Sequence, residues 1–273
     1  MNQYRPYPME FLAFIDFIMY VAAGAAVGFL VGLTGVGGGS LMTPLLIMFN
    51  FPPHIAIGTD LIYAAGTKAS GVVAHARLAT INWGIVLRLS MGSIPASLIT
   101  VYLLKNVFGS AENYQELLLT TLGVMLILTA MVILIKPMLN RSTSLSNESF
   151  GLLKKHQSGL TVLMGIFLGI AVTLTSVGAG AFGAAILMTL YPRLSPVTII
   201  GTDIAHAVPL TLIAGLGHMQ LGNVDFVLLG CLLVGSLPAI HFGSILSKRI
   251  PSKVLQPILA GLLLIIGVKY AFF

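Results

Sequence analysis

The chain has 273 residues, of which 57% are hydrophobic and only 8% are charged, and its formal net charge is +6. A soluble domain carries about 25% charged residues, so this composition excludes a soluble fold and predicts that most of the chain lies in lipid. The basic residues gather in short loops, as is typical of loops that orient a protein in a membrane. The sequence has no basic face with polar or aromatic partners, so it does not indicate a nucleic-acid partner. The single cysteine, Cys231, excludes an internal disulfide and a cysteine-cluster metal site.

The first half of the chain predicts an interrupted helical hairpin followed by three spans. An apolar run at 11–34 leads into the glycine loop Gly35–Gly39, and a short apolar run follows at 40–50. At 1.5 Å per residue the short run is about 16 Å long, roughly half the hydrocarbon thickness. We therefore expect the chain to turn at the glycines near mid-membrane. Longer apolar runs follow at 54–76, 83–105 and 114–136.

The second half repeats this order after a polar, Ser/Asn-rich linker. Its apolar runs cover 159–176, 181–191, 197–217, 224–247 and 253–272, with the second glycine loop at Gly178–Gly183. The predicted regions are a first transmembrane repeat at 1–137, a cytoplasmic linker at 138–158 and a second repeat at 159–273. Whether the short runs 40–50 and 181–191 cross the membrane fully or re-enter it stays open.

One set of short motifs occurs in both halves, 143 positions apart and without a gap. It comprises Gly-x-Gly at 35–37 and 178–180, Gly-Thr-Asp at 58–60 and 201–203, a histidine at 75 and 218, and Gly-Ser-x-Pro-Ala at 92–96 and 235–239. Each half has three full spans, an odd number, so the second half is expected to be inverted. The Lys and Arg residues flanking the linker place it in the cytoplasm and both termini outward.

The predicted fold is therefore an all-α, multi-pass integral membrane protein of two inverted repeats. Each repeat consists of a glycine-tipped helical hairpin and three full transmembrane helices, with about eight long hydrophobic helices in all. A duplicated, glycine-punctuated membrane protein is typical of a transporter, because a site between two related halves can open to either side.

The glycine loops are the first candidate site. Each begins a short helix whose first N–H groups have no partner inside the helix, and the helix dipole adds partial positive charge there. Glycine lets a ligand approach the backbone, so each loop predicts an anion site, to which nearby hydroxyls add donors. The alternative is close helix packing through small residues. The expected substrate-binding residues are Thr34, Gly35, Gly37, Gly38, Gly39, Ser40, Thr175, Ser176, Gly178 and Gly180.

Three of the charged residues inside apolar spans are candidates, because a charge in a membrane needs a partner or a function. Asp60 and Asp203 each stand about six residues into a span, roughly 9 Å deep. We expect them to brace the neighbouring glycine loops, with proton coupling as the alternative. Lys68, near the centre of its span, is predicted to be a counter-ion for a bound anion. An ion pair with a membrane carboxylate is the alternative.

Histidines supply further candidates. His206 lies inside a span and is a candidate substrate contact. His75 and His218 occupy matched positions and are interpreted as hydrogen-bonded boundary residues, although a histidine can also titrate during transport. The histidines show no paired ligand spacing, so we predict neither a metal site nor a cofactor. No Walker loop or Ser-His-Asp arrangement appears, so neither an enzyme nor an ATP-driven pump is predicted.

Taken together, these motifs resemble the sulfite exporter TauE/SafE family over nearly the whole chain. The resemblance rests on Leu33–Ser40 with Pro44, on Ala56–Asp60, on Gly92–Ala96 and on their copies. It implies an integral inner-membrane permease that moves sulfite, sulfonates or related small sulfur-containing organic anions, usually outward. The second loop departs from the first, because Ala181 and Phe182 stand where the first loop has two glycines.

The predicted function is a secondary transporter in a bacterial inner (plasma) membrane. It would export the anion by alternating access, with the anion held between the hairpin tips. A passive anion channel is the close alternative, and a membrane enzyme or a non-transporting scaffold is less favoured. The expected partners are a small anionic substrate and the lipid bilayer. Homo-oligomer formation, the coupling ion and the direction of transport in the cell stay open.

Overall fold

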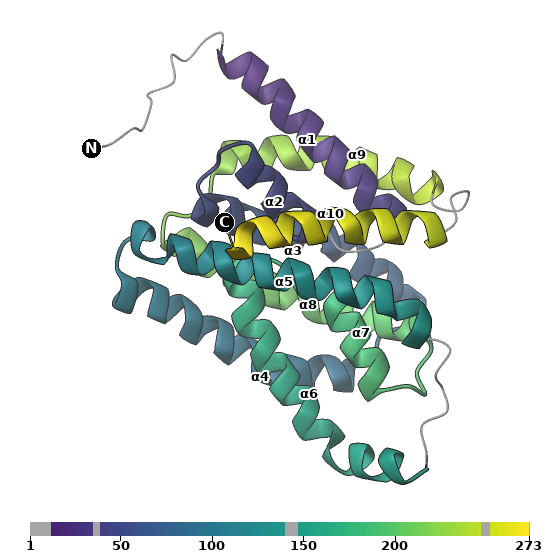
Figure 1. Cartoon of the computed structure of the whole chain (residues 1–273). Helices are drawn as coiled ribbons and strands as arrows, with labels where there is room; N and C mark the ends of the chain where they lie inside the picture. Colours follow the sequence, from purple (N-terminus) through teal and green to yellow (C-terminus); the bar gives the residue numbers. More distant parts are fainter. Residues whose placement is uncertain (1–11, 35–38, 140–146, 247–251, 273) are drawn as a thin grey trace.

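A computed structural model describes residues 12–34, 39–139, 147–246 and 252–272, and these residues form helices and connecting turns without a strand (Figure 1). The prediction of an all-helical membrane protein is confirmed. Within these described ranges, six segments are long and apolar enough to cross a membrane: Trp83–Phe108, Ala111–Ile135, His156–Thr175, Pro196–Gln220, Phe226–Leu246 and Leu255–Phe272. The inversion of the repeats and the number of eight membrane helices stay predictions.

The helices follow the predicted order in both halves. The first half contains α1 (Leu12–Thr34), α2 (Gly39–Met48), α3 (Pro53–Arg77), α4 (Trp83–Leu103), the π-helical turn η1 (Leu104–Phe108) and α5 (Ala111–Leu139). The second contains α6 (Asn147–Thr175), α7 (Ala181–Leu190), α8 (Pro196–Gln220), α9 (Phe226–Leu246) and α10 (Ser252–Phe272). Because α6 begins at Asn147, part of the predicted linker 138–158 belongs to this helix.

The repeat appears directly in the helix bounds. A shift of 143 positions carries α3 onto α8 and α4 onto α9, and in each case the first and last positions coincide. Both α3 and α8 carry proline in their first turn, where its missing N–H costs nothing. The starts of α4 and α9 are both capped by side chains, since Asn82 accepts from Ile85 N–H at 3.2 Å and Asp225 accepts from Leu228 N–H at 3.0 Å.

The two halves interlock instead of lying side by side. The most extensive helix–helix contacts pair α1 with α9, α4 with α6, α5 with α10, and α3 with α8 (Figure 1). Every one of these pairs joins a helix of the first half to a helix of the second. Under the 143-residue shift α1 corresponds to α6 and α9 to α4, so the first two pairs are equivalent.

Small residues allow the closest of these contacts. On α6, Gly165 and Gly169 lie against the backbone of Leu89 and Ser93 on α4, where a Cβ would overlap the facing carbonyl oxygens. On α1, Gly24, Gly28 and Gly32 lie in the same way against α9. Membrane helices associate through such small-residue faces because lipid gives no hydrophobic driving force between helices.

Two buried apolar clusters flank the middle of the bundle. One includes Leu46 of α2, Leu126 of α5 and Leu263 of α10. The other includes residues of α4, α6 and α8, such as Leu89 and Leu210. Phe182, which stands where the first glycine loop has a glycine, packs against both clusters. The departure of the second loop from the first therefore adds apolar packing at the start of α7.

We predict that Gly165→Ala destabilises the protein by about 1–3 kcal/mol, because the added methyl group must push α4 away from α6. The matched control is Gly159→Ala on the same helix, where a Cβ meets nothing within 4 Å. That change should be neutral or slightly stabilising, since alanine favours the helix over glycine. Thermal unfolding in detergent measures both, and equal melting temperatures for the two variants would contradict the close α4–α6 contact.

Candidate functional site

The second glycine loop interrupts the helix as predicted. Between the end of α6 and the start of α7, Ser176, Gly178 and Gly180 have positive φ values of 60°, 128° and 145°. The last two values are accessible mainly to glycine. Within the loop, the Val177 N–H donates to Thr175 Oγ1 at 3.0 Å. Residues 176–179 are buried, so this irregular backbone lies inside protein, as a break within a membrane requires.

Two backbone N–H groups in the first turn of α7 already have hydrogen-bond acceptors in the preceding loop. The N–H groups of Gly183 and Ala184 donate to the carbonyls of Gly178 and Gly180, both at 2.9 Å. These two donors are therefore not available to a ligand in this conformation. The predicted anion site at this loop depends on the remaining groups and on the side chains around it.

The first glycine loop lies largely outside the described residues. Gly35, Gly37 and Gly38 belong to the part of the chain that the structure does not describe, and the anion site predicted there stays a prediction. Thr34 is the last residue of α1 and Gly39 the first of α2. Ser40, in the first turn of α2, is buried.

Asp60 lies between the short helix of its own half and the glycine loop of the other. Its Oδ2 accepts a hydrogen bond from Thr43 Oγ1 of α2 at 2.6 Å, and the residue is fully buried. Its Oδ1 has no hydrogen-bond partner among the described residues. The Ser176 hydroxyl interacts with the same carboxylate without meeting the geometry of a hydrogen bond.

Asp203 occupies the equivalent place in the second half. Its carboxylate lies against Gly183 in the first turn of α7, where any side chain would overlap Oδ1. Asp203 is 2% exposed. Each Gly-Thr-Asp carboxylate thus adjoins the short helix of its own half, an arrangement that favours the bracing role expected for both aspartates.

Lys68 connects α3 to the second glycine loop. Its Nζ donates to the carbonyl oxygen of Ala179 at 2.9 Å. Within the described ranges the ammonium makes this one hydrogen bond and no ion pair. Asp60 and Asp203 act on its charge through space without contacting it. An ammonium has three donors, so two N–H groups of this buried lysine have no partner among the residues that the structure describes.

His206 is buried beside the same lysine. Its Nε2 lies 2.8 Å from Ser93 Oγ of α4, and its Nδ1 has no partner among the described residues. The charge of Lys68 acts on the imidazole through space. Under the 143-residue shift, Tyr63 of α3 corresponds to His206 and Ser236 of α9 corresponds to Ser93, and the side chains of Tyr63 and Ser236 also adjoin each other.

We call Asp60, Lys68, Ser176, Asp203 and His206 the central polar cluster. All five were predicted as site residues, and the structure brings them together from both halves of the chain. Ser93, Ser236, Tyr63 and Thr43 were not predicted. The serines belong to the repeated Gly-Ser-x-Pro-Ala motif, and a polar residue repeated within an apolar span is the signal that could have identified them.

The remaining residues of the Gly-Thr-Asp motif bind the opposite half. Thr59 Oγ1 accepts the N–H of Asp225 and Thr202 Oγ1 accepts the N–H of Asn82, both at 3.0 Å. Gly58 and Gly201 lie so close to the loops before α9 and α4 that a Cβ would overlap a backbone carbonyl oxygen. In each motif the glycine permits contact, the threonine accepts the bond, and the aspartate faces the short helix.

The two matched histidines fix these same loops and lie apart from the central polar cluster. His75 Nδ1 is 2.8 Å from Thr80 Oγ1. His218 Nε2 is 2.9 Å from the Thr173 carbonyl oxygen, and its Nδ1 is 3.2 Å from Asn223 Nδ2. This geometry favours their interpretation as hydrogen-bonded residues at helix ends. Among the described residues, no group of three or more His, Cys, Asp or Glu side chains is placed to hold a metal ion.

Comparison with known proteins gives this architecture a family. The sequence model described as "Sulfite exporter TauE/SafE" matches residues 20–270. The chain is 38% identical to the probable membrane transporter protein YjnA of Bacillus subtilis, over 92% of this chain and 98% of that protein. It is 30% identical to the probable membrane transporter protein YdhB of the same organism, over 87% and 96% of the two chains. No solved structure matches significantly.

We predict that Thr59→Val and Thr202→Val each lower the stability by about 1–3 kcal/mol, because each leaves a backbone N–H of the opposite half without its acceptor. Thr67→Val is the control, since the Thr67 hydroxyl bonds only within its own helix. Chemical or thermal unfolding of the purified variants measures the difference. If Thr67→Val destabilises the protein as much as the other two, the cross-half bonds are not what holds the loops.

Proposed function

The chain belongs to the sulfite exporter TauE/SafE family, and from this premise we propose that it is a secondary transporter that exports sulfite, a sulfonate or a related small sulfur-containing anion by alternating access. Membership of this family makes it a membrane transporter. The substrate class follows the family description. The single observation that carries the proposal is the buried Lys68 ammonium, which is bonded to a carbonyl of the opposite half's glycine loop and forms no ion pair with a carboxylate of the described residues.

The central polar cluster supplies the donors that an oxyanion needs. Two N–H groups of Lys68 have no partner in the described parts of the chain, and the Ser176 hydroxyl near Asp60 is a further donor. Hydrogen bonds from a charged donor to an anion are about twice as strong as neutral ones, and more so in a buried site. An anion that replaces the Ala179 carbonyl as the partner of Lys68 would loosen the link between α3 and the second glycine loop. Binding and conformational change would thereby be coupled.

The carboxylates set a condition on anion binding. With both aspartates ionised, one lysine cannot balance two negative charges, and an entering anion is repelled. Binding is favoured when one carboxyl carries a proton. Asp60 is held by Thr43 in its bracing position, which an amide can also occupy, so bracing remains the assigned role and proton coupling the alternative.

The moving parts of this transporter are not its sequence halves. The α1–α9 and α4–α6 pairs each contain one helix from each half, so separating the halves would break the most extensive helix–helix contacts of the bundle. We infer that access alternates through movement of these two equivalent pairs about the α3–α8 pair, which carries most of the central polar cluster. Equivalent pairs from inverted repeats give two states of similar energy, one open to each side.

Flux in proteoliposomes tests the proposal. We predict that the wild-type protein supports counterflow of labelled sulfite, and that Lys68→Gln lowers the apparent affinity at least tenfold, because a charge-assisted bond of about 1.5–3 kcal/mol is lost. Lys269→Gln is the control, since it removes the same charge from an exposed position at the end of α10. A passive channel would show sulfite flux without counterflow.

Asp60→Asn separates the two roles of the carboxylate in the same assay. The bracing role predicts transport that still responds to a pH gradient, because the amide oxygen accepts the Thr43 hydroxyl. Transport that persists in Asp60→Asn but ignores the pH gradient would make Asp60 the coupling site. Unchanged sulfite affinity in a folded Lys68→Gln variant would remove Lys68 from the substrate site.

The inverted topology is tested by cysteine labelling after the native Cys231 is replaced by serine. We predict that Ser144→Cys in the linker reacts with an impermeant maleimide only after the membrane is opened. Glu112→Cys, at the exposed start of α5, should react in intact spheroplasts. This pattern follows from the Lys and Arg residues that flank the linker. Labelling of the linker cysteine from outside is the result that contradicts both outward termini and the inverted repeat.

A further inference from the structure

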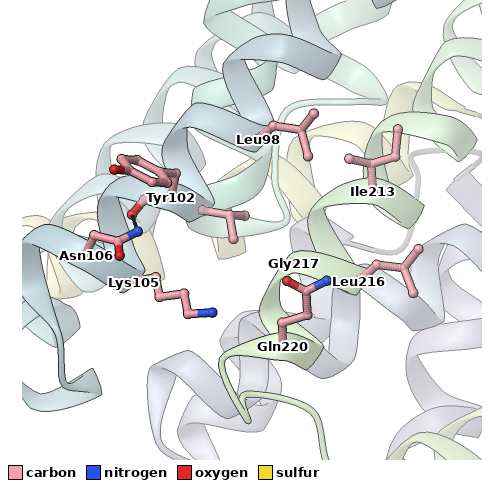
Figure 2. Close-up of a pocket in the computed structure, with 9 residues that line it drawn as sticks. Leu98, Tyr102, Lys105, Asn106, Ile213, Leu216, Gly217 and Gln220 are labelled. Carbon is pink, nitrogen blue, oxygen red and sulfur yellow. Dashed lines mark hydrogen bonds between the residues drawn. The ribbon is translucent and has the colours of Figure 1, made fainter.

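A cleft lies on the surface of the bundle between the end of α4 with η1 and the end of α8 (Figure 2). Its volume is about 620 Å³, and no residue of the central polar cluster lines it. Several of its side chains are exposed on the outside of membrane-spanning segments, including Leu98 (54%), Tyr102 (65%) and Leu216 (41%). In a bilayer this cleft therefore opens toward lipid.

The cleft is apolar at one end and polar at the other. Figure 2 shows Leu98 and Ile213 at one end, and Lys105 and Gln220 facing each other at the other. Gln220 is the last residue of α8, and Lys105 lies in η1, three residues before its end. The polar end is thus at the level where helices leave the hydrocarbon, which is where lipid headgroups lie.

The floor of the cleft is formed where α8 and α4 pack closely. Gly217 of α8 lies against Val101 of α4, and a Cβ at Gly217 would overlap the Val101 side chain. On the opposite side of the cleft, the π-helical turn η1 follows α4 and carries Lys105 and Asn106 (Figure 2). Asn106 Nδ2 donates to the Tyr102 carbonyl oxygen at 2.9 Å, which satisfies the backbone at this turn. A π-helical turn is uncommon and is often found at functional sites.

The charges of the cleft are of one sign. Lys105 is its one ionised residue, and no Asp or Glu lies among the residues that line it. Within the described ranges Lys105 forms no ion pair or hydrogen bond through its ammonium. The amides of Asn106 and Gln220 add neutral hydrogen-bond donors at the same end. An anionic group that sits at this level of the membrane would meet one unopposed cation and two amides.

We propose that this cleft binds a phospholipid with an anionic headgroup. The headgroup phosphate pairs with Lys105 at the polar end, and one acyl chain lies along Leu98 and Leu216. A soluble anion would leave the apolar end unused, and a neutral lipid would leave Lys105 without a counter-charge. A bound lipid here packs between α4 and α8, which belong to different halves, and so holds the two together at this end of the bundle.

Native mass spectrometry of the purified protein, titrated with phosphatidylglycerol or phosphatidylcholine, tests the site. We expect Lys105→Gln to weaken phosphatidylglycerol binding about fivefold, which corresponds to about 1 kcal/mol for one lysine near a headgroup. Lys269→Gln is the control, because it removes an exposed lysine at the same end of the bundle, where the C-terminal part of α10 packs on the N-terminal part of α5. Equal binding by these two variants overturns the proposal.

A second pair of variants tests the acyl-chain end without altering charge. Leu216→Trp should fill the cleft and lower lipid binding, whereas Leu212→Trp, equally exposed one turn earlier on α8 but outside the cleft, should not. Both positions are exposed, so neither change should disturb folding. Equal effects of the two tryptophans overturn the proposal.

Displacement of the lipid by inorganic phosphate, or equal affinity for phosphatidylcholine, also overturns it, because the site would then recognise a free anion or no headgroup charge. None of these outcomes depends on whether sulfite is transported.

Discussion

Polar groups inside a bilayer have no water to bond, and this constraint organises the whole chain. The Gly-Thr-Asp motifs meet it across the two halves, because Thr59 accepts the N–H of Asp225 and Thr202 accepts the N–H of Asn82. Each half therefore completes hydrogen bonds that the other cannot make alone. The two N–H groups bonded in this way lie at the starts of α9 and α4. These two helices are also the ones that pack against α1 and α6 of the opposite half.

The same constraint applies to charged side chains, which are more costly than neutral polar groups to place in a membrane without partners. A lysine within a membrane is costly unless it has partners, and Lys68 has one carbonyl and the field of two carboxylates. The cluster around it remains only partly satisfied, because Asp60 Oδ1 and His206 Nδ1 have no partners among the described residues. A partly satisfied buried network is unfavourable for a purely structural core, so it supports the binding role proposed for this cluster.

The short helices determine how the site is formed. Neither α2 nor α7, each of ten residues, is long enough as a helix to cross a bilayer, and the described break in the chain lies before α7. The break before α7 is stabilised by glycines at positive φ and by a threonine that accepts a backbone N–H. Phe182 then anchors the start of α7 in both apolar clusters. The backbone at the site is thus held by apolar packing on one side, while polar groups face it from the other.

The sequence alone determined the membrane class, the order and approximate bounds of the helices, the repeat and the family. These depend on local composition, length and spacing, which a chain carries without reference to its fold. It also identified Lys68, His206 and both aspartates, because ionisable residues stand out in apolar spans.

Only the tertiary structure decided their partners. Spacing within one half cannot show that Lys68 reaches Ala179, that Ser93 meets His206, or that the motif threonines bind the opposite half, because each contact joins residues more than 100 positions apart. Their geometry is fixed by how the two halves interlock.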